Sequence, residues 1–251
     1  MGWLDDNAGW IARAERWRPA HVETLRVRLW LSSPVVWDGR DPVSLDGVLG
    51  FLIVCRETGR LPDDVFASIG DAVVDLPVPV ADVEIDGRRV ACCSWARAPA
   101  CAVEALRFRR KRARVEAMAS VGSLGVSGGR FKSLNIPVAT LVTPWLDCYV
   151  RGDRAKIADL ARDLGGLGRD AARGLGAVLG VEIDDDPEDR SLLWRGRPQR
   201  ALPLVVDGGA YDVRQLDPDG YEERDATLRA PYWHARSMAH AVTPRTIVEA
   251  A

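Results

Sequence analysis

Residues 25–59 read LRVRLWLSSPVVWDGRDPVSLDGVLGFLIVCRETG, and this stretch decides the expected fold. Its first seven residues alternate between apolar side chains and a second set formed by Arg26, Arg28 and Trp30, which is the pattern of a half-buried strand. A turn-rich segment with two prolines and a glycine follows. Residues 45–59 then place apolar side chains at helical spacing and end at Gly59, which suits a helix C-cap. Asp46 stands at the start of this helix and is expected to cap it.

A second strand-helix unit is predicted downstream. Residues 136–150 are β-prone and interrupted by Pro144, so they predict a hairpin or a strand pair. An Arg-Gly-Asp turn leads into a helix that is expected to stop at Gly165, and residues 177–183 alternate like a strand. Two such units that return to one sheet predict an α+β fold of the ferredoxin-like kind.

The chain between the two units is expected to be an insertion. It spans about residues 76–134 and opens with strand signals on both sides of Asp86-Gly87, a dipeptide typical of hairpin turns. Tryptophans recur every seventh residue near the N-terminus, which puts them on one face of a helix: Trp3, Trp10 and Trp17. The predicted organisation is a helical extension over 1–24, a core domain over 25–206 that contains the insertion, and a tail over 207–251.

The composition of the 251 residues is that of an ordinary soluble protein, with 47% hydrophobic and 28% charged residues and a net charge of -2. No apolar run approaches the roughly 18 residues of a membrane span, so an integral membrane protein is excluded. The charged N-terminus lacks the apolar segment of a secretory signal. Five irregularly spaced cysteines fit a reducing compartment, and we expect a cytoplasmic protein.

Positive charge is concentrated in one part of the chain. Residues 97–132 hold nine basic residues against two acidic ones, and residues 107–114 alone hold six cations. Such a run is either a solvated face or a surface that binds a polyanion, with counterions released from each phosphate contacted. Phe108 lies inside the run and offers a base-stacking surface. The candidate RNA contacts here are Arg107, Phe108, Arg109, Arg110, Lys111, Arg112, Arg114, Arg130 and Lys132.

A glycine-rich segment at residues 165–176 is the second candidate site. Glycines let backbone N–H groups approach a phosphate, and arginines add charge that pairs with it. The segment is neither a Walker A loop nor a dinucleotide-binding fingerprint. The alternative is a helix-to-strand turn that needs positive φ angles. The residues concerned are Gly165, Gly166, Gly168, Arg169, Arg173, Gly174 and Gly176.

Catalytic and metal sites are not expected. His234 and His240 lie six residues apart and His21 lies just before the first expected strand, and no base-acid pair is evident among them. Cys92, Cys93 and Cys101 lack the CxxC spacing of a zinc site. We therefore predict no catalytic residue, no metal and no cofactor.

Four segments together resemble a known family: LRVRLWLSSPVVWDG, LDGVLGFLIV, FKSLNIPVATLVTPWLDCYVRGD and LGGLGRDAARGLGAVLGVEI. They look like the RAMP-type subunits of type IV CRISPR-Cas effector complexes. More narrowly, they resemble the Cas-five-like subunit that caps the crRNA at its 5-prime end. The resemblance covers roughly residues 25–206. It rests mainly on the "SP...LDG.L" opening combined with the late "G.LG....RG.G.V" loop.

This resemblance implies a ferredoxin-like (RAMP, RRM-like) core with a glycine-rich loop and an inserted β-hairpin thumb. It also implies binding to the 5-prime handle of the crRNA, and contacts with backbone RAMP subunits, with a large subunit and with target DNA near the point where the duplex enters. The glycine-rich loop matches the family's loop by position, and the basic run falls where the family carries its thumb. Such complexes act in antiviral defence and plasmid interference.

The expected function is therefore that of a non-catalytic crRNA-binding subunit, with Trp37, Phe108 and Phe131 as stacking candidates. One alternative is a metal-independent endoribonuclease that cuts CRISPR repeat RNA, with His21 or a tyrosine as base. A third is a scaffold that binds protein alone.

Overall fold

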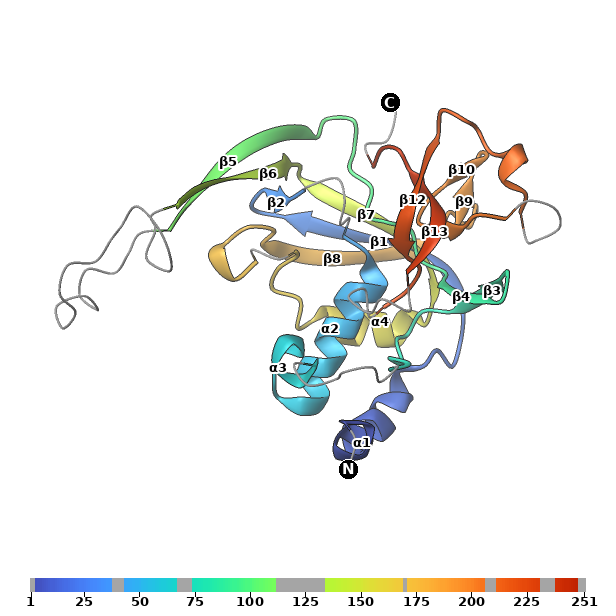
Figure 1. Cartoon of the computed structure of the whole chain (residues 1–251). Helices are drawn as coiled ribbons and strands as arrows, with labels where there is room; N and C mark the ends of the chain where they lie inside the picture. Colours follow the sequence, from blue (N-terminus) through green and yellow to red (C-terminus); the bar gives the residue numbers. More distant parts are fainter. Residues whose placement is uncertain are drawn as a thin grey trace.

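The computed structural model describes residues 3–37, 43–66, 74–111, 134–168, 171–205, 211–230 and 238–247 (Figure 1). Within these ranges the protein is a mixed α+β structure with several small antiparallel sheets and few helices. The α+β class predicted from the sequence is therefore confirmed. No helix in the described ranges is long and apolar enough to cross a membrane.

The central sheet has the strand order β7-β1-β8 and is antiparallel throughout. Strand β1 (Glu23–Leu31) lies between β7 (Trp145–Gly152) and β8 (Val178–Asp185). The alternation in its sequence is borne out, because Leu25, Val27 and Leu29 are fully buried in the main core. The intervening residues of β1 face the other side of the sheet.

Two helices cover the apolar face of this sheet, as Figure 1 shows: α2 (Leu45–Thr58) and α4 (Arg154–Ala161). Gly59 is the C-cap of α2, as predicted, and its φ of 67° places it in the left-handed region. Helix α4 begins after Asp153, whose carboxylate accepts a hydrogen bond from the Lys156 backbone N–H. It ends four residues before Gly165, the predicted stop.

The predicted capping role of Asp46 is wrong. Ser44 is the N-cap of α2, and Asp46 is the second residue of the helix, with a fully buried side chain. Its carboxylate accepts hydrogen bonds from the Ser44 hydroxyl and from the Ala230 backbone N–H at 3.2 Å. It also lies 4.0 Å from the guanidinium of Arg200, which is itself fully buried.

The N-terminal tryptophans lie on a helix, α1 (Trp3–Ala14), continued by the 3-10 turn η1 (Glu15–Trp17). Trp3 stacks on Phe66 of α3 (Pro62–Phe66) with ring centroids 5.5 Å apart, and Trp10 meets the same ring edge-on. Trp17 is buried and donates to Glu57 of α2. The extension is thus packed into the main core by all three tryptophans.

Two hairpins interrupt the chain between α2 and β7. The shorter, β3 (Asp82–Ile85) with β4 (Arg88–Ala91), turns at Asp86-Gly87 with φ angles of 51° and 67°, which confirms the predicted turn. The longer joins β5 (Val103–Lys111) to β6 (Leu134–Val142), and β6 also pairs with β2 (Val35–Val36). Strands β6 and β7 are consecutive around Pro144, but they belong to different sheets.

The C-terminal part of the chain forms a second apolar cluster together with Trp95 and two residues of the β3-β4 hairpin, and this part has its own sheet. Its strand order is β11-β13-β12, from β11 (Leu202–Pro203), β12 (Tyr221–Thr227) and β13 (Met238–Pro244). A two-stranded sheet, β9 (Leu193–Trp194) with β10 (Arg197–Pro198), and the 3-10 turn η5 (Val213–Gln215) complete this part. The sequence marks residues 207–251 off as a tail, yet their described part contributes two strands and several core residues.

Candidate nucleic-acid interface

The basic run begins on a strand of the long hairpin. Strand β5 pairs with β6 along its whole length, so that Arg107 lies opposite Val138, Arg109 opposite Ile136 and Lys111 opposite Leu134. The hairpin extends away from the rest of the molecule in Figure 1. The Arg107 side chain is exposed. The side chains of Phe108, Arg109, Arg110 and Lys111 lie outside what the structure describes, as do residues Arg112, Arg114, Arg130, Phe131 and Lys132 as a whole.

Arg97 does not belong to this basic face, although the sequence count includes it. Its side chain is buried, and its guanidinium donates to the backbone carbonyls of Thr246 at 2.6 Å and Pro198 at 3.2 Å. Its own backbone pairs with Asp147 of β7. Arg97 therefore links the C-terminal part of the chain to the central sheet through these hydrogen bonds.

The glycine-rich segment is a closed loop between α4 and β8. The Leu167 N–H donates to the Gly176 carbonyl at 2.8 Å, and the Val178 N–H donates to the Gly165 carbonyl at 3.2 Å. A 3-10 turn, η4 (Ala171–Arg173), lies within the loop. The φ angles are positive at Gly168, Gly174 and Gly176, which confirms that the segment is a turn needing glycine. Arg173 is exposed, and Arg169 lies outside the described residues.

Residues 32–37 bring the candidate elements together. On one side this segment binds the glycine-rich loop: the Gly176 N–H donates to the Pro34 carbonyl at 2.8 Å, and the Ala177 N–H donates to the Ser33 hydroxyl at 2.9 Å. On the other side it pairs with the long hairpin through β2, and the Trp37 N–H donates to the Ala139 carbonyl at 2.9 Å. The loop, the base of the basic hairpin and Trp37 are therefore neighbours.

The sequence alone did not assign this joining role to residues 32–34. The available signal was the Ser-Ser-Pro turn directly after the first strand, since short polar turns of this kind bind nearby backbone groups. The Trp37 side chain is half-buried and packs against the main core, which leaves part of the ring accessible for the predicted stacking.

Replacing Gly176 with alanine tests whether the loop depends on its glycines. A Cβ at Gly176 would lie 2.3 Å from the Leu167 carbonyl oxygen, and the φ of 65° adds backbone strain. We expect a loss of at least about 2 kcal/mol in the free energy of unfolding, measured by urea denaturation. Gly165→Ala is the matched control, because its Cβ meets nothing within 4 Å; equal losses in both variants would contradict this assignment.

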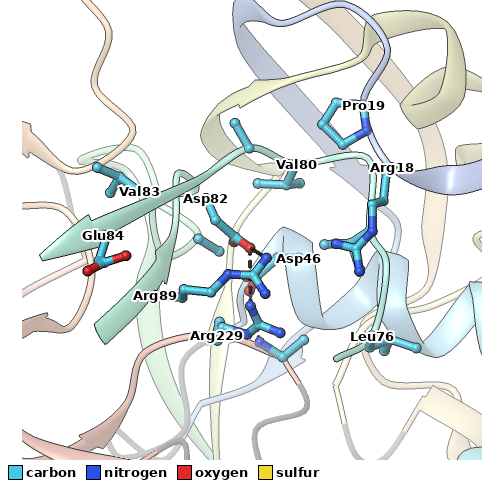
Figure 2. Close-up of a pocket in the computed structure, with 14 residues that line it drawn as sticks. Arg18, Pro19, Asp46, Leu76, Val80, Asp82, Val83, Glu84, Arg89 and Arg229 are labelled. Atoms are coloured by element: carbon cyan, nitrogen blue, oxygen red, sulfur yellow. Dashed lines mark hydrogen bonds and ion pairs between the residues drawn. The ribbon is translucent and has the colours of Figure 1, made fainter. Parts of the chain in front are cut away.

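An open pocket of about 470 Å³ lies away from this interface, between β3-β4 and the segment around Ala230 (Figure 2). Arginines and aspartates form an ion-pair network along it. Asp75 receives hydrogen bonds from Arg18 at 3.0 Å, Arg89 at 2.8 Å and Arg229, and Asp82 pairs with the last two of these arginines. Arg18 also pairs with Glu15, so three arginines face three carboxylates. The network therefore joins chain segments and does not present a basic surface.

The ion pairs of Asp75 make the free energy of unfolding depend on pH in the acid range. Burial alone would raise the pKa of Asp75, but hydrogen bonds from Arg89 and Arg229 outweigh burial and hold this pKa well below its usual range. A carboxyl group whose pKa is lower in the folded state stabilises the fold above its unfolded pKa of about 4, and this stabilisation is lost as the pH falls. We expect Asp75→Asn to cost about 1 kcal/mol at pH 7, since the side chain is 43% exposed. The gap between wild type and variant in urea denaturation should shrink from pH 5 to pH 3; a constant gap would contradict this.

The described histidines lie apart from the interface. His21 is exposed before β1, and His240 on β13 faces Glu223 at 3.6 Å and Asp225 at 3.4 Å. His234 lies outside the described residues. Across the described ranges, no three His, Cys, Asp or Glu side chains are grouped to hold a metal ion.

The sequence matches no protein-family model and no curated protein.

Proposed function

We propose that this chain is a non-catalytic crRNA-binding subunit of a type IV CRISPR-Cas effector complex. In this proposal it caps the 5-prime handle of the guide and docks against backbone RAMP subunits and the large subunit, close to the target DNA where the duplex enters. Its role in this proposal is to bind RNA without catalysis. Charged side chains and loop amides bind phosphates, and aromatic rings stack on unpaired bases.

The strand order supports a ferredoxin-like core. The chain runs β1-α2 and later β7-α4-β8, and both helices lie on one face of the sheet. Residues 93–97 run alongside β7, through antiparallel bridges from Cys93 to Val150 and from Arg97 to Asp147. If residues 93–97 are counted as a fourth strand, the order across the sheet is β8, β1, β7 and then residues 93–97. Two strand-helix-strand units interleaved in this order are the arrangement of the ferredoxin-like fold.

The observation that carries the RNA-binding proposal is the junction at residues 32–37. It fixes a glycine-rich loop and a basic hairpin on either side of one short segment. Arg107 on the hairpin and Arg173 in the loop are both exposed. An arrangement with two basic elements at one end of a sheet suits a strand of RNA that passes from one to the other, because each phosphate contact releases counterions.

Exposed apolar side chains support contacts with neighbouring subunits. Val103 is 61% exposed and Leu106 60% exposed on β5, and Val142 on β6 lies directly opposite Val103. Leu179 on β8 is 73% exposed. Apolar surface of this kind, next to a site for a shared guide RNA, is typical of a chain that is covered by partners in an assembly.

The proposal is tested by recovering RNA from the assembled complex. The complex is purified through a tag on this chain, and its RNA is extracted and sequenced after nuclease trimming. We expect protected guides whose 5-prime ends derive from the repeat, and an absorbance ratio at 260 and 280 nm above that of protein alone. A complex without RNA would favour a protein-only scaffold, and guides protected only at their 3-prime ends would refute capping of the handle.

A further inference from the structure

A pair of tryptophans lies on the face of the central sheet that the helices leave uncovered. Trp30 of β1 and Trp145 of β7 are directly opposite each other in the strand register, with ring centroids 5.2 Å apart. Trp30 is 36% exposed, which is a large exposed fraction for a tryptophan on the middle strand of a sheet. Trp145 is half-buried beside it.

Arg28 holds the two rings in place. Its guanidinium carbon lies 4.7 Å from the Trp145 ring centroid and 5.5 Å from that of Trp30. Asp147 fixes the guanidinium through two hydrogen bonds of 2.8 and 2.7 Å, and the Trp30 indole N–H points to Glu182 at 3.3 Å. The rings are therefore oriented before any ligand binds, which lowers the entropy lost on binding.

Space is open on the other side of Trp30. The residue opposite Trp30 on β8 is Gly180, and residues directly opposite in an antiparallel pair point to the same face. A Cβ built on Gly180 meets nothing within 4 Å. The opposite end of the same sheet face is covered instead, since the Arg190 guanidinium lies 3.8 Å from the Tyr149 ring, which is buried.

The tryptophan pair adjoins the junction described above. Trp30 is two residues before Ser32, whose N–H donates to the Ala177 carbonyl at the end of the glycine-rich loop. This part of the sheet carries no excess positive charge, because Arg28 pairs with Asp147, Arg26 pairs with Asp184, and Glu182 adds a further carboxylate beside Trp30. An attraction here would come from stacking and not from net charge.

We propose that Trp30, supported by Trp145 and positioned through Arg28, stacks on an unpaired nucleobase of bound RNA, with the base lying over Gly180. This inference rests on the proposed RNA-binding function and names a contact within it. An aromatic face accepts any base, so the contact should add affinity with little dependence on base identity.

The test compares variants at Trp30 and Gly180 for binding of labelled repeat RNA by the full chain. Trp30→Ala should weaken binding roughly tenfold, while the slope of log Kd against log salt stays unchanged. Gly180→Val should weaken binding similarly by filling the open space, without removing a ring. Trp30→Phe should retain binding within about threefold and lose part of the tryptophan fluorescence quenching that RNA causes.

Phe51→Ala is the control, because it removes a ring that is 48% exposed on α2, a helix that covers the opposite face of the sheet. If wild type binds RNA but Trp30→Ala and Gly180→Val bind equally well, the stacking inference is overturned and the proposed function stands. If Trp30→Ala keeps its RNA affinity but releases partner subunits, the face docks protein and the inference is also overturned. If wild type binds no RNA, the proposed function itself fails, and the inference fails with it.

Discussion

Arg200→Met is expected to lower the free energy of unfolding by about 3–5 kcal/mol, because it leaves a buried carboxylate without its cation. Arg200 is fully buried and lies 4.0 Å from the fully buried Asp46. Its guanidinium also donates to the carbonyls of Ala91 at 2.5 Å, Cys93 at 2.9 Å and Leu228. Ala91 and Cys93 are far from Leu228 in the chain, so this one side chain connects the C-terminal part to the central core. Thermal denaturation should show a midpoint lower by roughly 10 °C or more.

Two further variants distinguish the effect of the unpaired buried charge from the effect of losing a packed arginine side chain. Arg162→Met is the matched control, since that arginine is 78% exposed and pairs with Asp159 at the surface; its effect should stay within about 0.5 kcal/mol. Adding Asp46→Leu to Arg200→Met should recover part of the loss, because it removes the uncompensated carboxylate. A loss in Arg200→Met no greater than in the control would contradict the buried-charge account.

Reversing the charge of the basic hairpin should weaken RNA binding at least about 100-fold near 0.1 M salt, if each of three arginines contacts a phosphate. The variant is Arg107→Glu combined with Arg109→Glu and Arg110→Glu, which lie on one β5 segment that β6 pairs along its length. Losing three contacts should also lower the magnitude of the slope of log Kd against log salt by about two. Filter binding of labelled repeat RNA at four salt concentrations measures both quantities.

The matched control makes the same change in net charge elsewhere on the surface. It combines Arg60→Glu, Arg88→Glu and Arg245→Glu, three exposed arginines outside the interface. Non-specific repulsion of RNA would weaken binding in both triple variants alike. If the control loses as much affinity as the hairpin variant, or if the hairpin variant binds as wild type does, the basic run is not part of the site.

Local patterns were sufficient to predict much of the central architecture. The alternation of residues 25–31 marks β1 because side chains of a strand point to its two faces in turn. Gly59 and Asp86-Gly87 mark a helix end and a hairpin turn because both need positive φ angles. For the glycine-rich segment the same local logic left two alternatives, a phosphate-binding loop and a turn that needs positive φ angles. Each of these features depends on residues that are neighbours in the chain.

Features that depend on distant segments were not predictable in this way. Nothing in the sequence around Asp46 shows that its partner is Arg200, more than 150 residues away. Arg97 adds to the local charge count, yet the fold buries it against Pro198 and Thr246. Asp184 and Asp185 lie on β8 and pair with Arg26 and Arg154, which the residues around them do not indicate. The opposition of Trp30 and Trp145 likewise requires the strand register.

The central claim, that this chain binds guide RNA without cutting it, is tested most directly with the purified protein and end-labelled repeat RNA in EDTA. The same reactions are run on native and on denaturing gels. We predict a shifted band on the native gel and full-length RNA on the denaturing gel. A discrete cleavage product would identify a metal-independent endoribonuclease instead, and unshifted RNA at micromolar protein would contradict RNA binding by this chain.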